Sequence, residues 1–482
     1  MSDTDTPTRR RRRGRQQKAE RKASAVFEDS KLPSRASLRL VDGSQAGMIH
    51  EAVKAILWEV GVIIEHREMR QLMLREHGCR EGSGGYLQIA PDLVEWAIEQ
   101  APERIRLYDH DGNLRVDTAG RTTSYCPGHN CVRILDFRSN ELRPCSLEDI
   151  RETAKLCEAL PNIDMVCSLG YPSEVPPEDE VTETVRAMYE NCRKPAALLA
   201  HDEVIQERML NLIADMTGGW QRMADKPVCL ELMGPISPLK LPEELCLRLI
   251  NCARWGIPAV CSPATFPGMS CPITTAGAIA QSSAEALAGI VVHQLAEPGA
   301  PVMSGSAILP MDLRQANLAY GSPEYMTAGL GAADYFDSIG IPSWIGAGCS
   351  DSHQFDAQAA AEAGANLAIA GLAQSSFVHN LGFLSGGRTG SLQMLTLCDE
   401  LVGWSSKMAS GVEVDADTIA LEVVKRAVAN NDYLTDEHTQ ARFMTENWYP
   451  GLCERSDADA WLEAGAVDMT ERVNQRLRDL LG

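Results

Sequence analysis

The side chains with the most reactive chemistry stand together late in the chain. Cys349, Asp351 and His353 place a thiol, a carboxylate and an imidazole within five positions, in the stretch GCSDSHQFD (348–356). Groups of these kinds serve as nucleophiles and as proton donors or acceptors in enzymes. We take these three residues as the candidate catalytic set and expect them to shape a pocket at the end of a strand.

Two cofactor motifs come close to matching in the same stretch, and neither is complete. Asp351-Ser-His353-Gln-Phe-Asp356 approaches the Asp-x-His-x-x-Gly signature of proteins that hold cobalamin through a histidine, but Asp356 replaces the glycine. GAGCSD (346–351) begins like a dinucleotide-binding loop, but Asp351 stands where the third glycine belongs. A polar cluster in a loop is favoured over a bound cofactor.

A zinc site is considered around Cys126, His129 and Cys131, because zinc takes Cys and His ligands in a tetrahedral shell. The spacing matches no common zinc pattern, and a chain with 15 Cys brings thiols together by chance. Incidental thiols are favoured, and no metal ligand is predicted. His379, inside an apolar segment, fits a pocket residue or a hydrogen-bonded core histidine, and the core position is favoured.

Aromatic side chains are sparse, at 5% of the residues, yet several lie near the candidate catalytic set. Aromatic faces attract quaternary ammonium ions through cation–π interaction, worth about 0.5–2 kcal/mol per contact. The predicted cage combines two residues of this segment with three from other loops: Trp344, Phe355, Tyr171, Phe266 and Phe383.

Gln358 and Glu362 lie four positions apart on a predicted helix, so both point to one side of it. We predict that they support the catalytic loop by hydrogen bonds from behind. An ordinary solvated helix face is the alternative.

The elements that must position these residues follow a regular rhythm, in which short apolar segments alternate with helical patterns. Candidate strands occupy residues 122–126, 163–169, 195–200, 228–233, 258–261, 301–304, 343–346 and 376–381. Eight such units over about 280 residues fit an α/β fold of the (β/α)8 TIM barrel type. A doubly wound open sheet is the alternative.

The remaining segments are expected to be additions to this barrel. We predict a disordered basic tail over 1–36, an N-terminal α/β extension with a helical and mixed layer over 37–120, the barrel over 121–407 and a C-terminal helical region over 408–482. Helical spacing ends at Gly61 in the extension, and further helices are expected over 90–100, 415–430 and 458–481.

Charge and composition exclude several classes of protein. The net charge is −21, and residues 1–22 hold nine basic and three acidic side chains, which leaves −27 on the body. Such a surface repels nucleic acid. The first residues are positively charged but lack an apolar segment, so we expect no signal peptide, and no run reaches the length of a membrane span. With 15 Cys and no secretory signal expected, free thiols in the cytoplasm are favoured.

Several stretches resemble the trimethylamine methyltransferase family, over nearly the whole chain from residue 45. They are SLEDIRETAKLCEALPNID (146–164), PISPLKLP (235–242), PITTAGAIAQSSAEALAGIVVHQLAEPGAPV (272–302), GSPEY (321–325), SDSHQFDAQAAAEAG (350–364) and LTDEHT (434–439). The resemblance implies a TIM barrel that transfers a methyl group from a substrate nitrogen to the Co(I) of a separate corrinoid protein.

The resemblance also places Cys349 where the founding members carry pyrrolysine, which marks this chain as similar to the non-pyrrolysine branch. Pyrrolysine is thought to activate trimethylamine through its imine, and a thiol cannot do so. A quaternary amine needs no such help, because its nitrogen is already positive and it leaves as a neutral amine. The expected substrate is therefore a quaternary amine similar to glycine betaine.

A betaine would also require a partner for its carboxylate, and His201 or Arg388 is the candidate. The expected acceptor is the cobalamin of a partner protein, with no cofactor held tightly by this chain, and a homo-oligomer is expected on general grounds. Two alternatives remain open. One is a zinc-dependent corrinoid methyltransferase of the methanol or thiol type, and the other is a non-catalytic barrel that binds methylamines.

Overall fold

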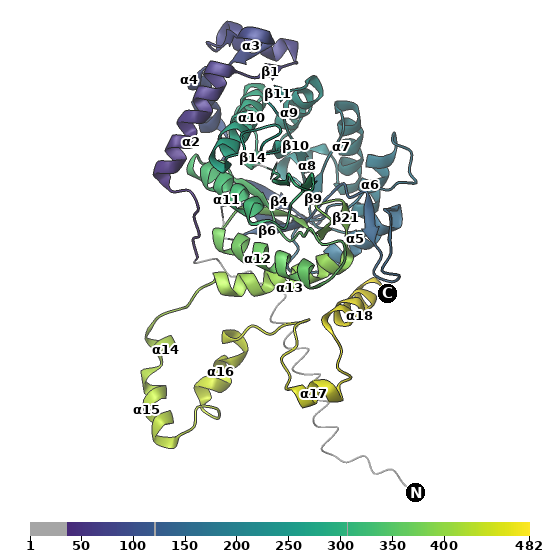
Figure 1. The fold of residues 1–482 in the computed structure, drawn as a ribbon, viewed down its shortest axis with the longest axis vertical. Helices are drawn as coiled ribbons and strands as arrows, with labels where there is room; N and C mark the ends of the chain where they lie inside the picture. Colours follow the sequence, from purple (N-terminus) through teal and green to yellow (C-terminus); the bar gives the residue numbers. More distant parts are fainter. Residues whose placement is uncertain (1–35, 120–121, 306) are drawn as a thin grey trace.

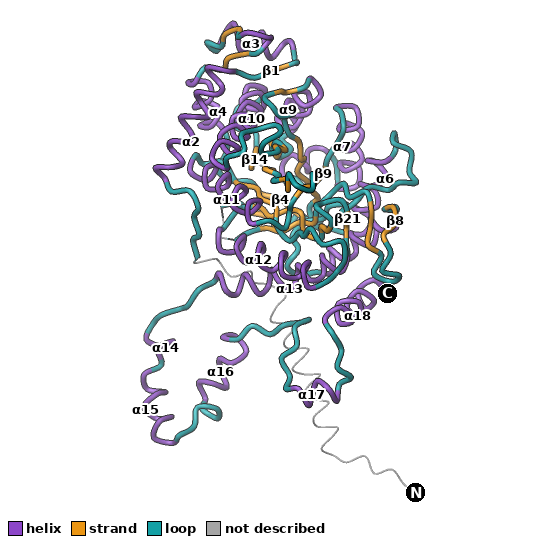
Figure 2. Tube along the Cα trace, viewed as in Figure 1, coloured by secondary structure: helices purple, strands orange, loops and turns teal. Residues whose placement is uncertain are grey.

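A parallel sheet of seven short strands curves around the centre of the molecule (Figures 1 and 2). The computed structural model describes residues 36–119, 122–305 and 307–482, so the predicted basic tail lies outside the described residues except at its last position. In spatial order the strands are β6 (Ser124–Pro127), β19 (Phe377–Leu381), β18 (Ser343–Gly346), β14 (Val302–Gly305), β12 (Ala259–Cys261), β10 (Cys229–Met233) and β9 (Ala196–Leu198). These seven strands coincide with seven of the eight predicted ones.

The eighth predicted strand, residues 163–169, lies between the two ends of this sheet. The Asp164 amide donates to the Tyr125 carbonyl at 2.9 Å on one side, and the Val166 amide donates to the Pro195 carbonyl at 2.9 Å on the other. This segment links β6 to β9 and closes the ring. The predicted TIM barrel is confirmed, and the open doubly wound sheet is wrong.

Helices cover the outside of the barrel, as the βα rhythm requires. They are α5 (Leu147–Ala159), α6 (Glu180–Asn191), α7 (Glu203–Thr217), α8 (Trp220–Asp225), α9 (Glu243–Trp255), α10 (Thr275–Ala296), α11 (Pro323–Ser338), α12 (Ala357–Ala373) and α13 (Leu392–Ala409). By length and composition α10 could cross a membrane, but 78% of its apolar window is buried. Since it packs against α9 and α11 on the barrel, α10 is a core helix.

The barrel interior is filled by apolar side chains that alternate with outward-facing ones along each strand. On β18, Trp344 joins the interior cluster, whereas Ile345 joins the layer between strands and helices. A hairpin of β4 (Arg106–Tyr108) and β5 (Leu114–Asp117) contributes Leu107 to the interior cluster. Because the hairpin precedes the first barrel strand and contributes to this packed core, we look for function at the opposite, C-terminal rim.

The N-terminal extension packs on the side of the barrel (Figure 1). It consists of α2 (Gly43–Ala55), the π-helical turn η1 (Ile56–Val60), β1 (Ile63–Ile64), α3 (Arg67–Glu76), β2 (Arg80–Glu81), η2 (Ser83–Gly85), β3 (Leu87–Gln88) and α4 (Pro91–Gln100). Asp42 begins α2 with a capping box, and Gly61, at φ +87°, ends the helical run as predicted. Contacts of α2 and α4 with α10 attach this layer to the barrel.

Further short strands form small sheets outside the seven-stranded sheet. One sheet holds β7 (Arg133–Leu135), β8 (Leu142–Pro144), β20 (Phe383–Leu384) and β21 (Thr389–Gly390). The pairs are β13 (Ala264–Thr265) with β15 (Ala307–Ile308), β16 (Met311–Asp312) with β17 (Asn317–Leu318), and β11 (Lys240–Leu241) with β1 of the N-terminal extension.

The C-terminal region consists of short helices, where two long ones are expected. They are α14 (Ala416–Ile419), α15 (Leu421–Asn430), α16 (Glu437–Glu446), α17 (Ala458–Glu463) and α18 (Met469–Leu481). The two long helices expected here are each interrupted, at Ala420 with φ +54° and at Gly465 with φ +98°. The segment α14–α16 extends away from the barrel, whereas α18 returns to pack on α13 and α5 (Figure 1).

Candidate functional site

Cys349 lies in the loop just after β18 and is fully buried. Its Sγ donates to the Tyr320 carbonyl at 3.7 Å. Asn366 of α12 fixes the backbone on both sides, since its Oδ1 accepts from the Gly348 amide at 2.7 Å and its Nδ2 donates to the Cys349 carbonyl at 3.0 Å. Burial raises the pKa of the Cys349 thiol well above its ordinary value, so the thiol is uncharged at neutral pH.

Asp351 holds two loops together. Its carboxylate accepts hydrogen bonds from the amides of Tyr320 at 2.8 Å and Gly321 at 3.0 Å, and its own amide donates to Glu362 at 2.9 Å. Burial raises the pKa of Asp351, and the two amide donors oppose that shift. This carboxylate positions the segment that carries Tyr320.

Glu362 of α12 accepts hydrogen bonds from this loop. One of its carboxylate oxygens accepts from Ser350 Oγ at 2.6 Å as well as from the Asp351 amide, and the other accepts from Gln358 Nε2 at 2.9 Å. Glu362 therefore lies behind the loop, and Gln358 reaches the loop only through Glu362.

The rest of the GCSDSHQFD stretch leads into α12. Asp356 begins that helix by accepting from the Ala359 amide at 2.9 Å, which explains why an aspartate replaces the glycine of the cobalamin-like motif. His353 is exposed and its Nδ1 lies 2.9 Å from Ser385 Oγ. Phe355 is half-buried and packs against α12 and α13.

A continuous series of aromatic rings runs from the barrel interior to the rim, and we call it the aromatic wall. Trp344 stacks on Phe377 and His379, with ring centroids 4.7 Å and 4.5 Å apart. His379 meets Phe383 edge-on at 6.4 Å, and Phe383 meets Tyr320 edge-on at 6.2 Å. The wall therefore joins β18, β19 and β20 to the loop before α11.

Two glycines let the rings approach the backbone. A Cβ at Gly128 would lie 1.9 Å from the Phe383 ring, and one at Gly346 would lie 1.8 Å from the hydroxyl of Tyr325. Tyr325 extends the wall because its ring lies 4.9 Å from that of Tyr320. Neither tyrosine is among the predicted site residues, although Tyr325 stands in the family-like stretch GSPEY.

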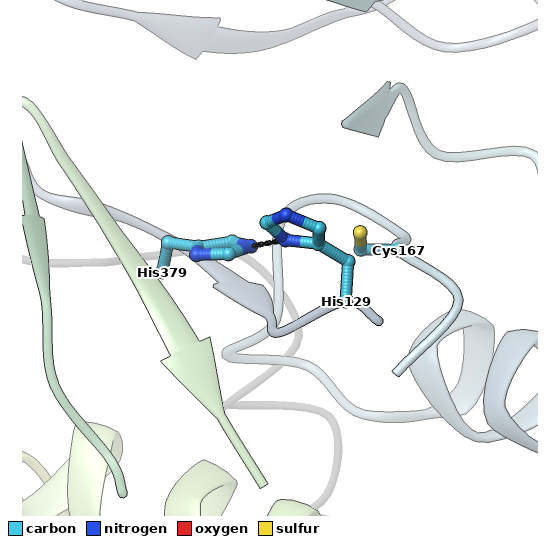
Figure 3. A group of neighbouring side chains, drawn as sticks. All are labelled: His129, Cys167 and His379. Carbon is cyan, nitrogen blue, oxygen red and sulfur yellow. Dashed lines mark hydrogen bonds between the residues drawn. The ribbon is translucent and has the colours of Figure 1, made fainter. Parts of the chain in front are cut away.

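A group of three potential metal ligands lies beside the wall (Figure 3). His129, which follows β6, and His379 of β19 face each other with Nδ1 and Nε2 3.0 Å apart. Cys167 offers its Sγ next to them, and all three ligand atoms lie within 4.8 Å of one another. Burial lowers the pKa of His129 to about 4 and that of His379 well below its ordinary value, so both imidazoles are neutral at pH 7.

Comparison with known proteins shows what this barrel is. The family model described as trimethylamine methyltransferase matches residues 10–482. The chain belongs to that family. A glycine betaine methyltransferase of Desulfitobacterium hafniense is 28% identical over 439 residues, with 91% of each chain covered. A trimethylamine methyltransferase of the same species is 27% identical over 434 residues, covering 90% of this chain and 87% of the relative.

Among solved structures, a hydroxylamine complex of MtmB resembles the fold with a TM-score of 0.49 at 10% identity, covering 92% of this chain and 89% of that one. Membership of the family makes this protein a methyltransferase. His129, Phe383 and the loop at Cys349 follow the C-terminal ends of β6, β19 and β18, where TIM-barrel enzymes place their active sites.

In this methyltransferase the structure separates the predicted substrate-binding residues into two groups. Trp344 and Phe383 belong to the aromatic wall. Tyr171 is exposed and Phe266 is half-buried, and neither has a ring contact with the wall among the described residues. His201 is exposed beside Glu180 at 3.2 Å, and Arg388 donates to Asn317 at 2.9 Å.

Proposed function

We propose that this methyltransferase moves a methyl group from a quaternary amine of the glycine betaine class to the Co(I) of a separate corrinoid protein. The observation that carries the proposal is the aromatic wall. Trp344, Phe383 and Tyr320 belong to one series of ring contacts that runs from the barrel interior to the rim, and aromatic faces attract a quaternary ammonium ion with about 0.5–2 kcal/mol per contact. The glycine betaine methyltransferase that the chain resembles supports the same substrate class.

The methyl transfer needs no general acid or base. The methyl carbon accepts the electron pair of the Co(I) acceptor, and the electrons of the broken C–N bond stay on nitrogen, which leaves as a neutral tertiary amine. No proton moves in this step. The protein must instead remove water from the cation and aim one methyl group at the acceptor, for which apolar rings are suited.

The surroundings of Cys349 agree with such a step. Its thiol is buried, uncharged and hydrogen-bonded to the Tyr320 carbonyl, so it is poorly placed to act as a nucleophile. We infer that Cys349 and Asp351 position Tyr320 in the wall. The thiol then takes no part in bond formation.

An anaerobic assay tests the proposal. Purified protein and cob(I)alamin, or a purified corrinoid protein, are incubated with glycine betaine, proline betaine, carnitine, choline or trimethylamine, and loss of the Co(I) absorbance is followed. We expect methylation with a quaternary amine and none with trimethylamine. Reaction with trimethylamine alone would contradict the proposal.

A second candidate function rests on His129, Cys167 and His379. Zinc held by imidazole and thiolate ligands activates thiols and alcohols in other enzymes, so a zinc-dependent transfer from methanol or a methylthiol is the alternative. Adding both compounds to the same assay separates the two candidates.

A further inference from the structure

We propose that His129, Cys167 and His379 bind a Zn²⁺ ion at the rim of the barrel, and that its open coordination position takes the carboxylate of the methyl donor. The metal part stands on the geometry of the three side chains alone. The carboxylate part rests on the proposed function.

The three ligand atoms lie close to the arrangement that zinc requires. With Zn–N bonds of about 2.0–2.1 Å and a Zn–S bond of about 2.3 Å, tetrahedral ligands are about 3.3 Å apart for two nitrogens and about 3.6 Å for nitrogen and sulfur. Nδ1 of His129 and Nε2 of His379 are 3.0 Å apart, and Sγ of Cys167 lies within 4.8 Å of both. Only small side-chain movements separate this arrangement from a coordinated ion.

Neighbouring groups orient the ligands. The Asn380 side chain hydrogen-bonds to the His379 imidazole, and its Nδ2 is committed as a donor to Tyr325 Oη at 2.8 Å. This contact holds the His379 ring in place while its Nε2 faces Nδ1 of His129. The Cys126 thiol hydrogen-bonds to Cys167. Second contacts of this kind fix metal ligands in known sites.

The ligand set favours zinc and leaves room for a substrate. Imidazole and thiolate are the ligands of Zn²⁺, whereas Mg²⁺ and Ca²⁺ require oxygen. Catalytic zinc sites have three protein ligands and one open position, and within the part of the chain that the structure describes this group has three. His129 is only half-buried, so the open position can be reached from the rim.

A bound cation would supply a positive charge that the buried Lys and Arg side chains among the described residues do not offer. A betaine carries a carboxylate, and the buried basic side chains among the described residues are Lys194 and Arg248. Lys194 donates to three backbone carbonyls, and Arg248 pairs with Glu231, so neither is free. A Zn²⁺ ion beside Trp344 and Phe383 would hold the carboxylate while the ammonium lies on the aromatic wall.

The metal is tested first, without any assay of activity. Tag-free full-length protein, freed of metal with a chelator, is titrated with Co²⁺, which reports on zinc sites by its visible spectrum. We expect one equivalent to bind with a thiolate-to-cobalt charge-transfer band. Cys167→Ser abolishes that band, and His129→Gln weakens Co²⁺ binding strongly. Cys229→Ser, at a buried thiol of strand β10 outside this group, leaves both unchanged.

Circular dichroism of the metal-free variants confirms that they fold. A wild-type protein without the charge-transfer band, or a Cys167→Ser protein that keeps it, would overturn the metal site.

The carboxylate is tested on the Co²⁺-loaded protein. Glycine betaine is expected to shift the visible bands, and trimethylamine, which lacks a carboxylate, to leave them unchanged. An unchanged spectrum with saturating betaine would overturn the carboxylate role even where methyl transfer occurs. Metal binding without methyl transfer from any quaternary amine would instead overturn the proposed function and leave the metal site standing.

Discussion

Two neighbouring parts of the rim differ in the partners of their polar atoms. One is the loop from Gly348 to Asp356, and the other is the aromatic wall with its His–Cys group. In the loop, the Asp351 carboxylate accepts hydrogen bonds from two backbone amides. The Glu362 carboxylate accepts from Ser350 Oγ and from the Asp351 amide. Beside the wall, His129 and His379 face chiefly each other.

The difference separates positioning from binding. Polar groups whose hydrogen bonds end on backbone hold a structure in place, because breaking them leaves buried donors unpaired. Side chains that hydrogen-bond chiefly to one another beside an apolar surface can exchange that bond for a ligand. Substitutions in the loop should therefore lower stability first, whereas substitutions in the wall should lower affinity first.

The largest effect is expected from Asp351→Ala. It leaves the half-buried amides of Tyr320 and Gly321 without their acceptor, at up to about 1–3 kcal/mol for each. We expect the free energy of unfolding to fall by about 2–4 kcal/mol, measured by chemical denaturation. Asp351→Asn keeps one acceptor oxygen and should lose less. Equal stability of Asp351→Ala and wild type would break the comparison.

Phe383→Leu should act mainly on the substrate. The substitution keeps apolar volume and removes the π face, so the dissociation constant for glycine betaine should rise by about 2–30-fold, as a cation–π contact of about 0.5–2 kcal/mol implies. Isothermal titration calorimetry measures this change. The matched control is Phe336→Leu, a buried ring of α11 that packs on Tyr335. Equal weakening in both variants would mean that the wall does not recognise the cation.

Cys349→Ala is expected to change little. The thiol is buried and donates to a carbonyl, so turnover should stay within about 3-fold of wild type and the free energy of unfolding should fall by about 1 kcal/mol. Steady-state rates of Co(I) methylation measure the first, and denaturation the second. A loss of turnover of about 100-fold in a stable variant would show that the thiol takes part in the reaction.

The smallest effect is expected from Arg388→Gln. The guanidinium donates to Asn317, and the proposed zinc ion supplies the charge that a carboxylate needs. We expect KM for glycine betaine to stay within about 2-fold. A rise of KM by about 10-fold without a change in kcat would assign the carboxylate to Arg388 instead.

The sequence predicts the fold better than the site. The apolar segments that end in Gly, Pro or Ser mark all eight barrel positions, because strand length and βα alternation are local properties. The same pattern marks the segment 163–169 as a strand. In the structure it joins the barrel through hydrogen bonds to the carbonyls of Tyr125 and Pro195. The breaks at Ala420 and at Gly465–Ala466 were not predicted, because one or two left-handed residues leave the apolar spacing on either side intact.

The site depends on contacts between distant strands, which spacing cannot show. His129 and His379 are 250 positions apart, and Cys167 comes from a third segment, so their meeting follows from barrel closure alone. The spacing suggests His129 as a zinc ligand together with Cys126 and Cys131, whereas the structure places His129 beside Cys167 and His379. Tyr320 enters the wall only because Asp351 holds its backbone, and no motif marks that contact.

Recognition of the cationic nitrogen by the aromatic wall is tested most directly by comparing glycine betaine with tert-butylacetate, which has the same shape and carboxylate but carbon in place of nitrogen. Both affinities are measured by calorimetry on the same protein. If Trp344, Phe383 and Tyr320 recognise the cation, betaine binds at least about 5-fold more tightly. Equal affinity of the two compounds would contradict a quaternary-amine site.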